Sequence, residues 1–83
     1  MSTYSDFIDL VHTTKDRQLL EDFLTSITTE KERKELVRRV EIVKRLLAGD
    51  AQAKIASDLK VGIATVTRGS KELAQGGFKV LRK

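Results

Sequence analysis

The sequence has no cysteine, no proline and no tryptophan, and these absences narrow what the chain can be. Without cysteine it can form neither disulfides nor thiolate metal sites, and it suits a reducing compartment. The single histidine, His12, has no cluster of carboxylates around it in the sequence that would complete a metal site. A chain of 83 residues forms one small domain with a marginal core, so oligomerisation is the remaining way to stabilise it.

Long apolar runs are also missing. We find no signal peptide and no segment near the length of a membrane span, so we expect a cytoplasmic protein without membrane contact. The usual chemistry of an enzyme is missing as well, because there is no cysteine nucleophile, no histidine close to a carboxylate in the sequence and no phosphate-binding glycine loop. We therefore expect a protein that is not an enzyme.

Glycine is absent from the first 48 residues, and with no proline this half of the chain lacks strong helix breakers. Apolar residues recur there at helical spacing, which predicts one helix after Ser5 as its cap and a second from Asp16 to about Ser26. The whole chain is predicted to be all-α, with five helices and a short sixth segment. The apolar stripes of the first two helices are interpreted as core or dimer interface, because three Phe and one Tyr give no case for a cofactor pocket there.

A long third helix is predicted from Glu30 to about Ala48. Thr29 and Glu32 have the spacing of a capping box, in which the hydroxyl and the carboxylate each accept a hydrogen bond from a free backbone amide. Gly49 is expected to end this helix in a left-handed conformation, and Asp50 to cap the next helix.

Residues 52–68 have the pattern of a helix-turn-helix, two short helices joined by a tight turn. We predict that Ala56 lies where the two helices pack closely, and that four apolar residues form their shared core: Ile55, Leu59, Val61 and Val66. The second helix, from Ile63 to Leu73 or Ala74, would enter a DNA major groove. One feature argues against this motif, because Lys60 occupies the turn position that usually requires a left-handed residue. An ordinary helical hairpin is the alternative.

Charge is divided unevenly along the chain. Residues 1–37 contain five Lys/Arg and eight Asp/Glu, a net charge of −3, whereas residues 38–83 contain eleven and four, a net charge of +7. Since the helix-turn-helix lies in the basic half, we expect a polyanion as partner, with double-stranded DNA favoured. A helical protein-interaction module that docks an acidic protein is the alternative.

The segments GIATVTRGSKEL (62–73) and RVEIVKRLLAG (39–49), with Thr29, Glu32 and Arg33 before them, resemble the Trp repressor family. The resemblance covers roughly residues 19–74. It implies an intertwined homodimer that represses transcription by binding a palindromic operator, with L-tryptophan as the corepressor of the best-known member.

This resemblance also implies a layout and a ligand site. Residues 1–28 would be dimerisation helices, 29–49 the central helix, 50–74 the helix-turn-helix and 75–83 a short tail, within one domain. Arg39 and Arg68 would flank the indole, Gly69 would leave room for the ring, and Thr29 of the other subunit would lie near the ligand carboxylate. Glu72 stands where the family has a serine near the amino group. It could pair with an ammonium, or bridge to Arg68 and fill the pocket, so a regulator with another ligand or none stays an alternative.

DNA contacts are predicted for residues of both helices of the motif: Gln52, Lys54, Gly62, Ile63, Ala64, Thr65, Thr67, Ser70 and Lys71. Small and hydroxylated side chains suit close approach to thymine methyl groups and phosphates. Ala53 and Ala56 fall where the family usually has basic side chains, so either the operator differs or Lys54 makes one of those contacts. The tail is expected either to pack Phe78 and Leu81 against a partner or to fray.

Overall fold

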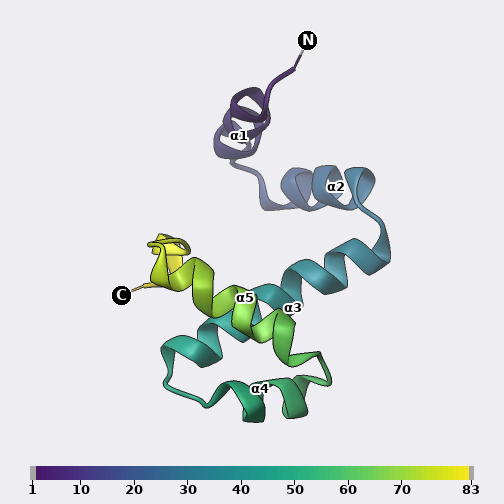
Figure 1. Ribbon diagram of the computed structural model, residues 1–83. Helices are drawn as coiled ribbons and strands as arrows, with labels where there is room; N and C mark the ends of the chain where they lie inside the picture. Colours follow the sequence, from purple (N-terminus) through teal and green to yellow (C-terminus); the bar gives the residue numbers. More distant parts are fainter. Residues whose placement is uncertain (1, 83) are drawn as a thin grey trace. The chain divides into compact units, whose positions relative to one another are not determined.

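The computed structural model describes residues 2–82. Its helices are α1 (Tyr4–Thr13), α2 (Arg17–Ile27), α3 (Glu30–Leu47), α4 (Gln52–Leu59), α5 (Ile63–Ala74) and a short 3₁₀ helix η1 (Lys79–Leu81), and the described residues contain no strand. The predicted all-α fold with five helices and a short sixth segment is confirmed. Chain contacts divide the molecule into two compact units, residues 1–33 and 34–83 (Figure 1).

In the first unit, α1 and α2 are fixed by local capping. The predicted cap at Ser5 is wrong, because Thr3 caps α1 instead: its Oγ1 accepts from the Asp6 amide at 3.1 Å, while the Thr3 amide donates to Asp6 Oδ2 at 2.9 Å. This reciprocal pair satisfies two free amides, whereas a Ser5 cap would require α1 to begin later. Asp16 caps α2 by accepting from the Gln18 amide at 2.8 Å.

Aromatic rings join the two helices of this unit, because the Phe7 and Phe23 ring centroids lie 5.9 Å apart. At the end of α2, Arg33 donates through Nη1 to the Thr28 carbonyl at 2.8 Å and the Thr25 carbonyl at 3.1 Å. Neither α1 nor α2 has a buried residue. Their apolar stripes are therefore only partly covered within this unit.

The capping box that begins α3 is confirmed. The Thr29 amide donates to Glu32 Oε1 at 2.8 Å, and the Glu32 amide donates to Thr29 Oγ1 at 3.1 Å. Accepting the Thr29 amide lowers the pKa of the Glu32 carboxyl. At the other end of α3, Gly49 has the predicted left-handed conformation, with φ of 93°.

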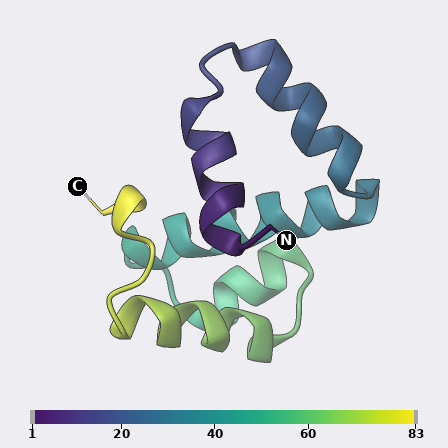
Figure 2. The same cartoon turned by 90° about the horizontal axis from the view of Figure 1, so that it is seen from above.

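The second unit is built around the C-terminal half of α3, α4 and α5, which Figures 1 and 2 show from two directions. Four apolar side chains are at most 2% exposed: Ile42, Val43, Ile55 and Val66. Leu46, Ala56, Leu59 and Val61 pack around this core as partly buried residues. The four predicted core positions of the helix-turn-helix are thus all in the core or against it, and α3 adds Ile42 and Val43.

Lys60 forms the turn between α4 and α5 even though it is not a glycine. This residue adopts the left-handed conformation itself, with φ of 56° and ψ of 47°, and its amide caps the end of α4. A side chain other than glycine, asparagine or aspartate is uncommon there and costs of the order of 1 kcal/mol or more. Gly62 has an ordinary φ of −68°, so the turn does not require glycine at that position.

We expect Ile55→Ala to lower the free energy of unfolding by about 2–5 kcal/mol, because Ile55 is fully buried at the centre of the second unit. Ile63→Ala removes the same atoms from a side chain that is 52% exposed, and should cost about 0.5 kcal/mol or less. Urea unfolding at one fixed protein concentration measures both. Equal losses would show that this core does not stabilise the fold.

Candidate functional site

Three stripes of side chains run along α5, because residues three, four and seven positions apart share a helix face. Val66 is fully buried, and Gly69 lies against α3, where an added Cβ would be 3.4 Å from Ile42 Cγ2. A second stripe contains Thr65, Arg68 and Glu72, and a third contains Ala64, Thr67 and Lys71. All members of these two stripes are exposed except Thr67, which is partly buried. One face of α5 therefore packs, and two remain accessible.

At the start of α5 the backbone amides are open to an external partner. Gly62 is the N-cap residue and provides no side-chain hydrogen bond to the first turn, while Ile63 is 52% exposed. A Cβ added to Gly62 would meet no atom within 4 Å. Packing within the chain thus gives no reason for glycine, whereas close approach of another molecule would give one.

Gln52 and Thr67 are predicted DNA contacts that the structure joins to each other. The Thr67 hydroxyl donates to Gln52 Oε1 at 2.9 Å, and both residues are partly buried. This bond ties the start of α4 to the middle of α5. The bond uses the Thr67 hydroxyl proton. The NH₂ group of Gln52 takes no part in it and can still donate hydrogen bonds.

A cleft with a volume of about 470 Å³ lies between α3 and α5 and reaches the tail. This volume is in the range of small-molecule sites. The residues lining it come from three segments of the second unit: Arg39, Ile42 and Val43 from α3, Ala64, Thr65, Arg68, Gly69 and Glu72 from α5, and Phe78 from the tail. Four of the five predicted ligand residues are therefore brought together.

The fifth, Thr29, belongs to the first unit, where its hydroxyl accepts the Glu32 amide. In the cleft, Arg68 and Glu72 are four residues apart on one stripe, yet no hydrogen bond or ion pair joins them among residues 2–82. The cleft thus combines two guanidinium groups, one carboxylate and an apolar floor, which is chemistry suited to a zwitterion with an apolar side chain.

A smaller polar hollow of about 260 Å³ lies beside the start of α5. Its lining residues are Glu35, Arg38, Arg39, Lys60, Val61, Gly62 and Thr65. Neither Arg38 nor Lys60 was predicted from the sequence to contribute a positive charge to a site. Their proximity depends on the way the turn returns to α3, and no local sequence pattern indicates it.

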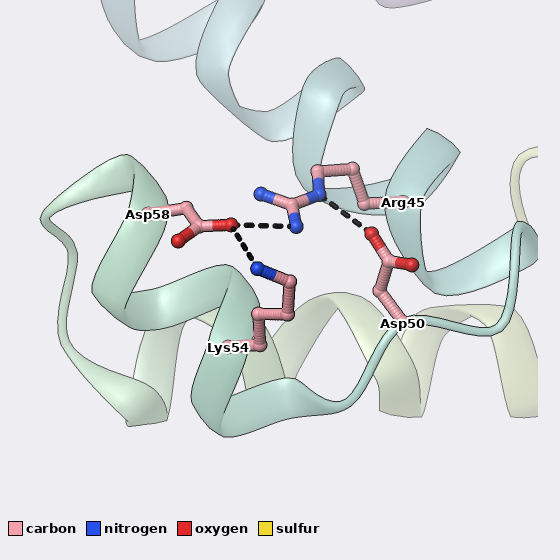
Figure 3. Close-up of polar contacts among 4 residues, drawn as sticks. All are labelled: Arg45, Asp50, Lys54 and Asp58. Atoms are coloured by element: carbon pink, nitrogen blue, oxygen red, sulfur yellow. Dashed lines mark hydrogen bonds and ion pairs between the residues drawn. The ribbon is translucent and has the colours of Figure 1, made fainter.

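The predicted cap at Asp50 is wrong. Ala51 is the N-cap residue of α4 and makes no side-chain cap, whereas Asp50 Oδ2 accepts from Arg45 Nε at 2.7 Å. Arg45 also donates through Nη2 to Asp58 Oδ2 at 2.8 Å, and the Lys54 ammonium lies 3.2 Å from the same oxygen (Figure 3). Asp50 does not cap the helix because its carboxylate makes a charge-assisted bond to Arg45, which is stronger than a bond to an amide.

Lys54, predicted to contact DNA, is thus paired with Asp58, although its side chain is 65% exposed. Such an exposed pair is weak and exchanges readily with other anions. The remaining predicted contacts, Ser70 and Lys71, are on α5, the first partly buried and the second exposed. In the first helix Ala53 is exposed, and Ala56 packs against the core as expected.

Known proteins match nearly the whole chain. The family model described as Trp repressor protein matches residues 2–80. The chain belongs to the Trp repressor family. A Trp operon repressor homolog of Vibrio cholerae is 45% identical over 73 residues, which is 87% of this chain and 71% of that protein. The homolog of Vibrio campbellii is 42% identical over 71 residues, 84% of this chain and 71% of its own length.

Membership of the Trp repressor family makes this chain a DNA-binding transcriptional regulator rather than an enzyme. Within residues 2–82, no group of three or more His, Cys, Asp or Glu side chains could hold a metal ion. No helix in the described part of the chain is long and apolar enough to cross a membrane.

The network around Arg45 predicts a pH-dependent stability. Hydrogen bonds from Arg45, the larger effect, and from Lys54 lower the pKa of the Asp58 carboxyl. The ionised carboxylate therefore stabilises the fold at pH values above its unfolded pKa of about 4. This stabilisation is lost as the pH falls through the folded pKa of Asp58. Asp58→Asn should lower the melting temperature at pH 7, and the difference from wild type should shrink toward pH 3.

Glu41→Gln is the matched control, since Glu41 is an exposed carboxylate on α3, the helix that carries Arg45. Its melting temperature should follow that of the wild type at both pH values. If Asp58→Asn had the same melting temperature as the wild type at pH 7, the network around Arg45 would contribute nothing to stability.

Proposed function

We propose that this protein is a homodimeric repressor that binds a palindromic operator through α4 and α5 and responds to L-tryptophan in the cleft. The observation that best supports this proposal is the position of the cleft on α5. Arg68 and Ala64 of this helix line the cleft, and Ala64 shares a stripe with Thr67 and the exposed Lys71. A ligand there would touch the helix that contacts DNA.

Dimerisation is supported by the large apolar side chains that remain exposed in each of the two units. Large apolar side chains of α1, α2 and the first part of α3 are 37–78% exposed: Tyr4, Ile8, Leu10, Leu19, Leu24, Ile27, Leu36, Val37 and Val40. Apolar residues exposed in this number indicate an interaction surface. A second copy would cover it and would supplement the small core. By family resemblance, the partner subunit would also bring its Thr29 to the cleft.

Contacts with DNA are supported by the character of the outward surface of the motif. Ile63, Ala64 and Thr65 would approach base edges, where methyl groups of protein and thymine can meet. Free amides at the start of α5, with Gly62 open to solvent, would bind a phosphate. Cationic and polar side chains at the margins would bind further phosphates: Arg38, Gln52, Lys54, Lys60, Ser70 and Lys71.

The ligand proposal is supported by the composition of the cleft. Ile42 and Val43 form an apolar floor, and Arg39 and Arg68 offer planar guanidinium groups that stack on aromatic rings and bind carboxylates. Glu72 would accept the ammonium of an amino acid. The same carboxylate favours the second candidate, a regulator of this fold that answers to another ligand or to none, because the family has serine there.

The function can be tested by selecting duplexes from a random pool with the purified protein and L-tryptophan, then footprinting the selected site. We expect a two-fold symmetric footprint whose half-sites lie about 34 Å apart, one turn of DNA. L-tryptophan should raise operator affinity roughly 5- to 150-fold, the usual range of coupling between two sites. Arg39→Ala should bind DNA without this dependence on tryptophan.

The outcomes separate the parts of the proposal. An asymmetric footprint would contradict the dimer. A symmetric footprint at equal affinity with and without L-tryptophan would remove the corepressor and leave the second candidate.

Phosphate binding by α5 can be tested with a pair of lysine variants. Lys71→Ala and Lys44→Ala each remove one exposed positive charge, the first from α5 and the second from α3. Lys71→Ala should weaken operator binding and make the slope of log affinity against log salt less negative by about 0.9. Lys44→Ala should keep the wild-type slope. If gel-shift titrations gave the same salt dependence for the two variants, Lys71 would not contact a DNA phosphate.

A further inference from the structure

The chain after α5 folds back as a C-terminal hook, residues 75–82. Gly76 has φ of 89° and donates its amide to the Leu73 carbonyl at 3.1 Å, while the Gly77 amide donates to the Glu72 carbonyl at 2.9 Å. Phe78 follows with φ of 56° and ψ of 38°, again left-handed, and η1 comes next. Two left-handed residues within three positions reverse the chain.

Specific contacts hold this reversal. A Cβ on Gly77 would lie 3.0 Å from the Glu72 carbonyl oxygen, so any other residue here would require the backbone to shift by a few tenths of an ångström. Arg82 Nε donates to the Gly77 carbonyl at 3.0 Å, and Arg82 Nη2 donates to the Leu73 carbonyl. The guanidinium thus satisfies a carbonyl at the end of α5 and one inside the hook.

The hook has three large apolar side chains, Phe78, Val80 and Leu81, and Leu81 is partly buried. Val80 is 85% exposed, whereas Phe78 is half-buried and lines the cleft together with Arg68 and Glu72. Of these three side chains, Phe78 is the one that reaches the cleft. A left-handed phenylalanine is a strained conformation that persists only where its surroundings hold it, and strain of this kind concentrates at ligand sites.

Resting on the effector role proposed for the cleft, we propose that Phe78 is a specificity-determining residue that forms an aromatic wall of the ligand site. The guanidinium groups and Glu72 recognise the charged part that all amino acids share. Only the lining of the cleft can distinguish their side chains, and Phe78 is its one aromatic residue. A ring that packs against a ring gains more than an aliphatic side chain of similar area. The hook thus selects an aromatic amino acid.

Calorimetric titration of the full chain with L-tryptophan, and with L-leucine in competition, tests this inference. Phe78→Leu keeps an apolar side chain in the hook but removes the ring. It should weaken L-tryptophan binding roughly 2- to 10-fold and narrow the preference for L-tryptophan over L-leucine by the same factor. Arg82→Ala releases the hook and should have a similar effect. Val80→Ala, a change in the same hook away from the cleft, should bind as the wild type does.

Circular dichroism melting and gel shifts with nonspecific duplex establish that each variant is folded, so a loss of ligand cannot be mistaken for unfolding. Wild-type preference retained in Phe78→Leu would overturn the role of Phe78 and leave the effector role intact. Tighter binding by Phe78→Ala would also overturn it, since the ring would then block the site. If the wild type binds no aromatic amino acid, both effector claims fall, while the operator footprint still tests the repressor.

Discussion

The structure depends on how one face of α5 is seated on α3. Val66 enters the core, and Gly69 lies against the side chains of Ile42, Val43 and Leu46 at the edge of the cleft. The other two faces of this twelve-residue helix stay accessible, and they meet at Ala64, which belongs to the outward stripe and also lines the cleft. Under the proposed function, one short element would therefore contact both ligand and DNA, because neighbouring helix residues point about 100° apart.

Local sequence patterns predicted the helices well. The capping box at Thr29, the left-handed Gly49 and the core positions from Ile55 to Val66 each follow from residues a few positions apart, where helix geometry leaves little choice. The wrong predictions at Ser5 and Asp50 share one cause. Each residue could serve as a cap, but a stronger interaction took its place. At α1 the reciprocal Thr3–Asp6 pair caps the helix instead of Ser5, and the Asp50 carboxylate bonds to Arg45 instead of to an amide of α4. Competition between partners is invisible in a pattern of residue types.

The candidate site was predicted to a similar extent. Family motifs pointed to Arg39, Arg68, Gly69 and Glu72, and these residues do line one cleft, although their roles stay predictions. The motifs gave no indication of Phe78, because its place depends on two glycine turns and on Arg82, nine residues beyond Leu73. Nor did they indicate the hollow that joins Arg38 to Lys60. Contacts made by chain reversal require the three-dimensional path, which the sequence pattern does not contain.

The bond between Thr67 and Gln52 has a mechanical consequence. Together with the packing of Val66 against Ile55, this bond joins α4 and α5 into one helix pair. Arg45 of α3 holds one side of this pair through its hydrogen bonds to Asp50 and Asp58. On the side of the cleft, within residues 2–82, no hydrogen bond joins Arg39, Ile42 or Val43 to α5. We therefore expect α4 and α5 to move together relative to α3, because separating these two helices would break the Thr67–Gln52 bond and open their shared core.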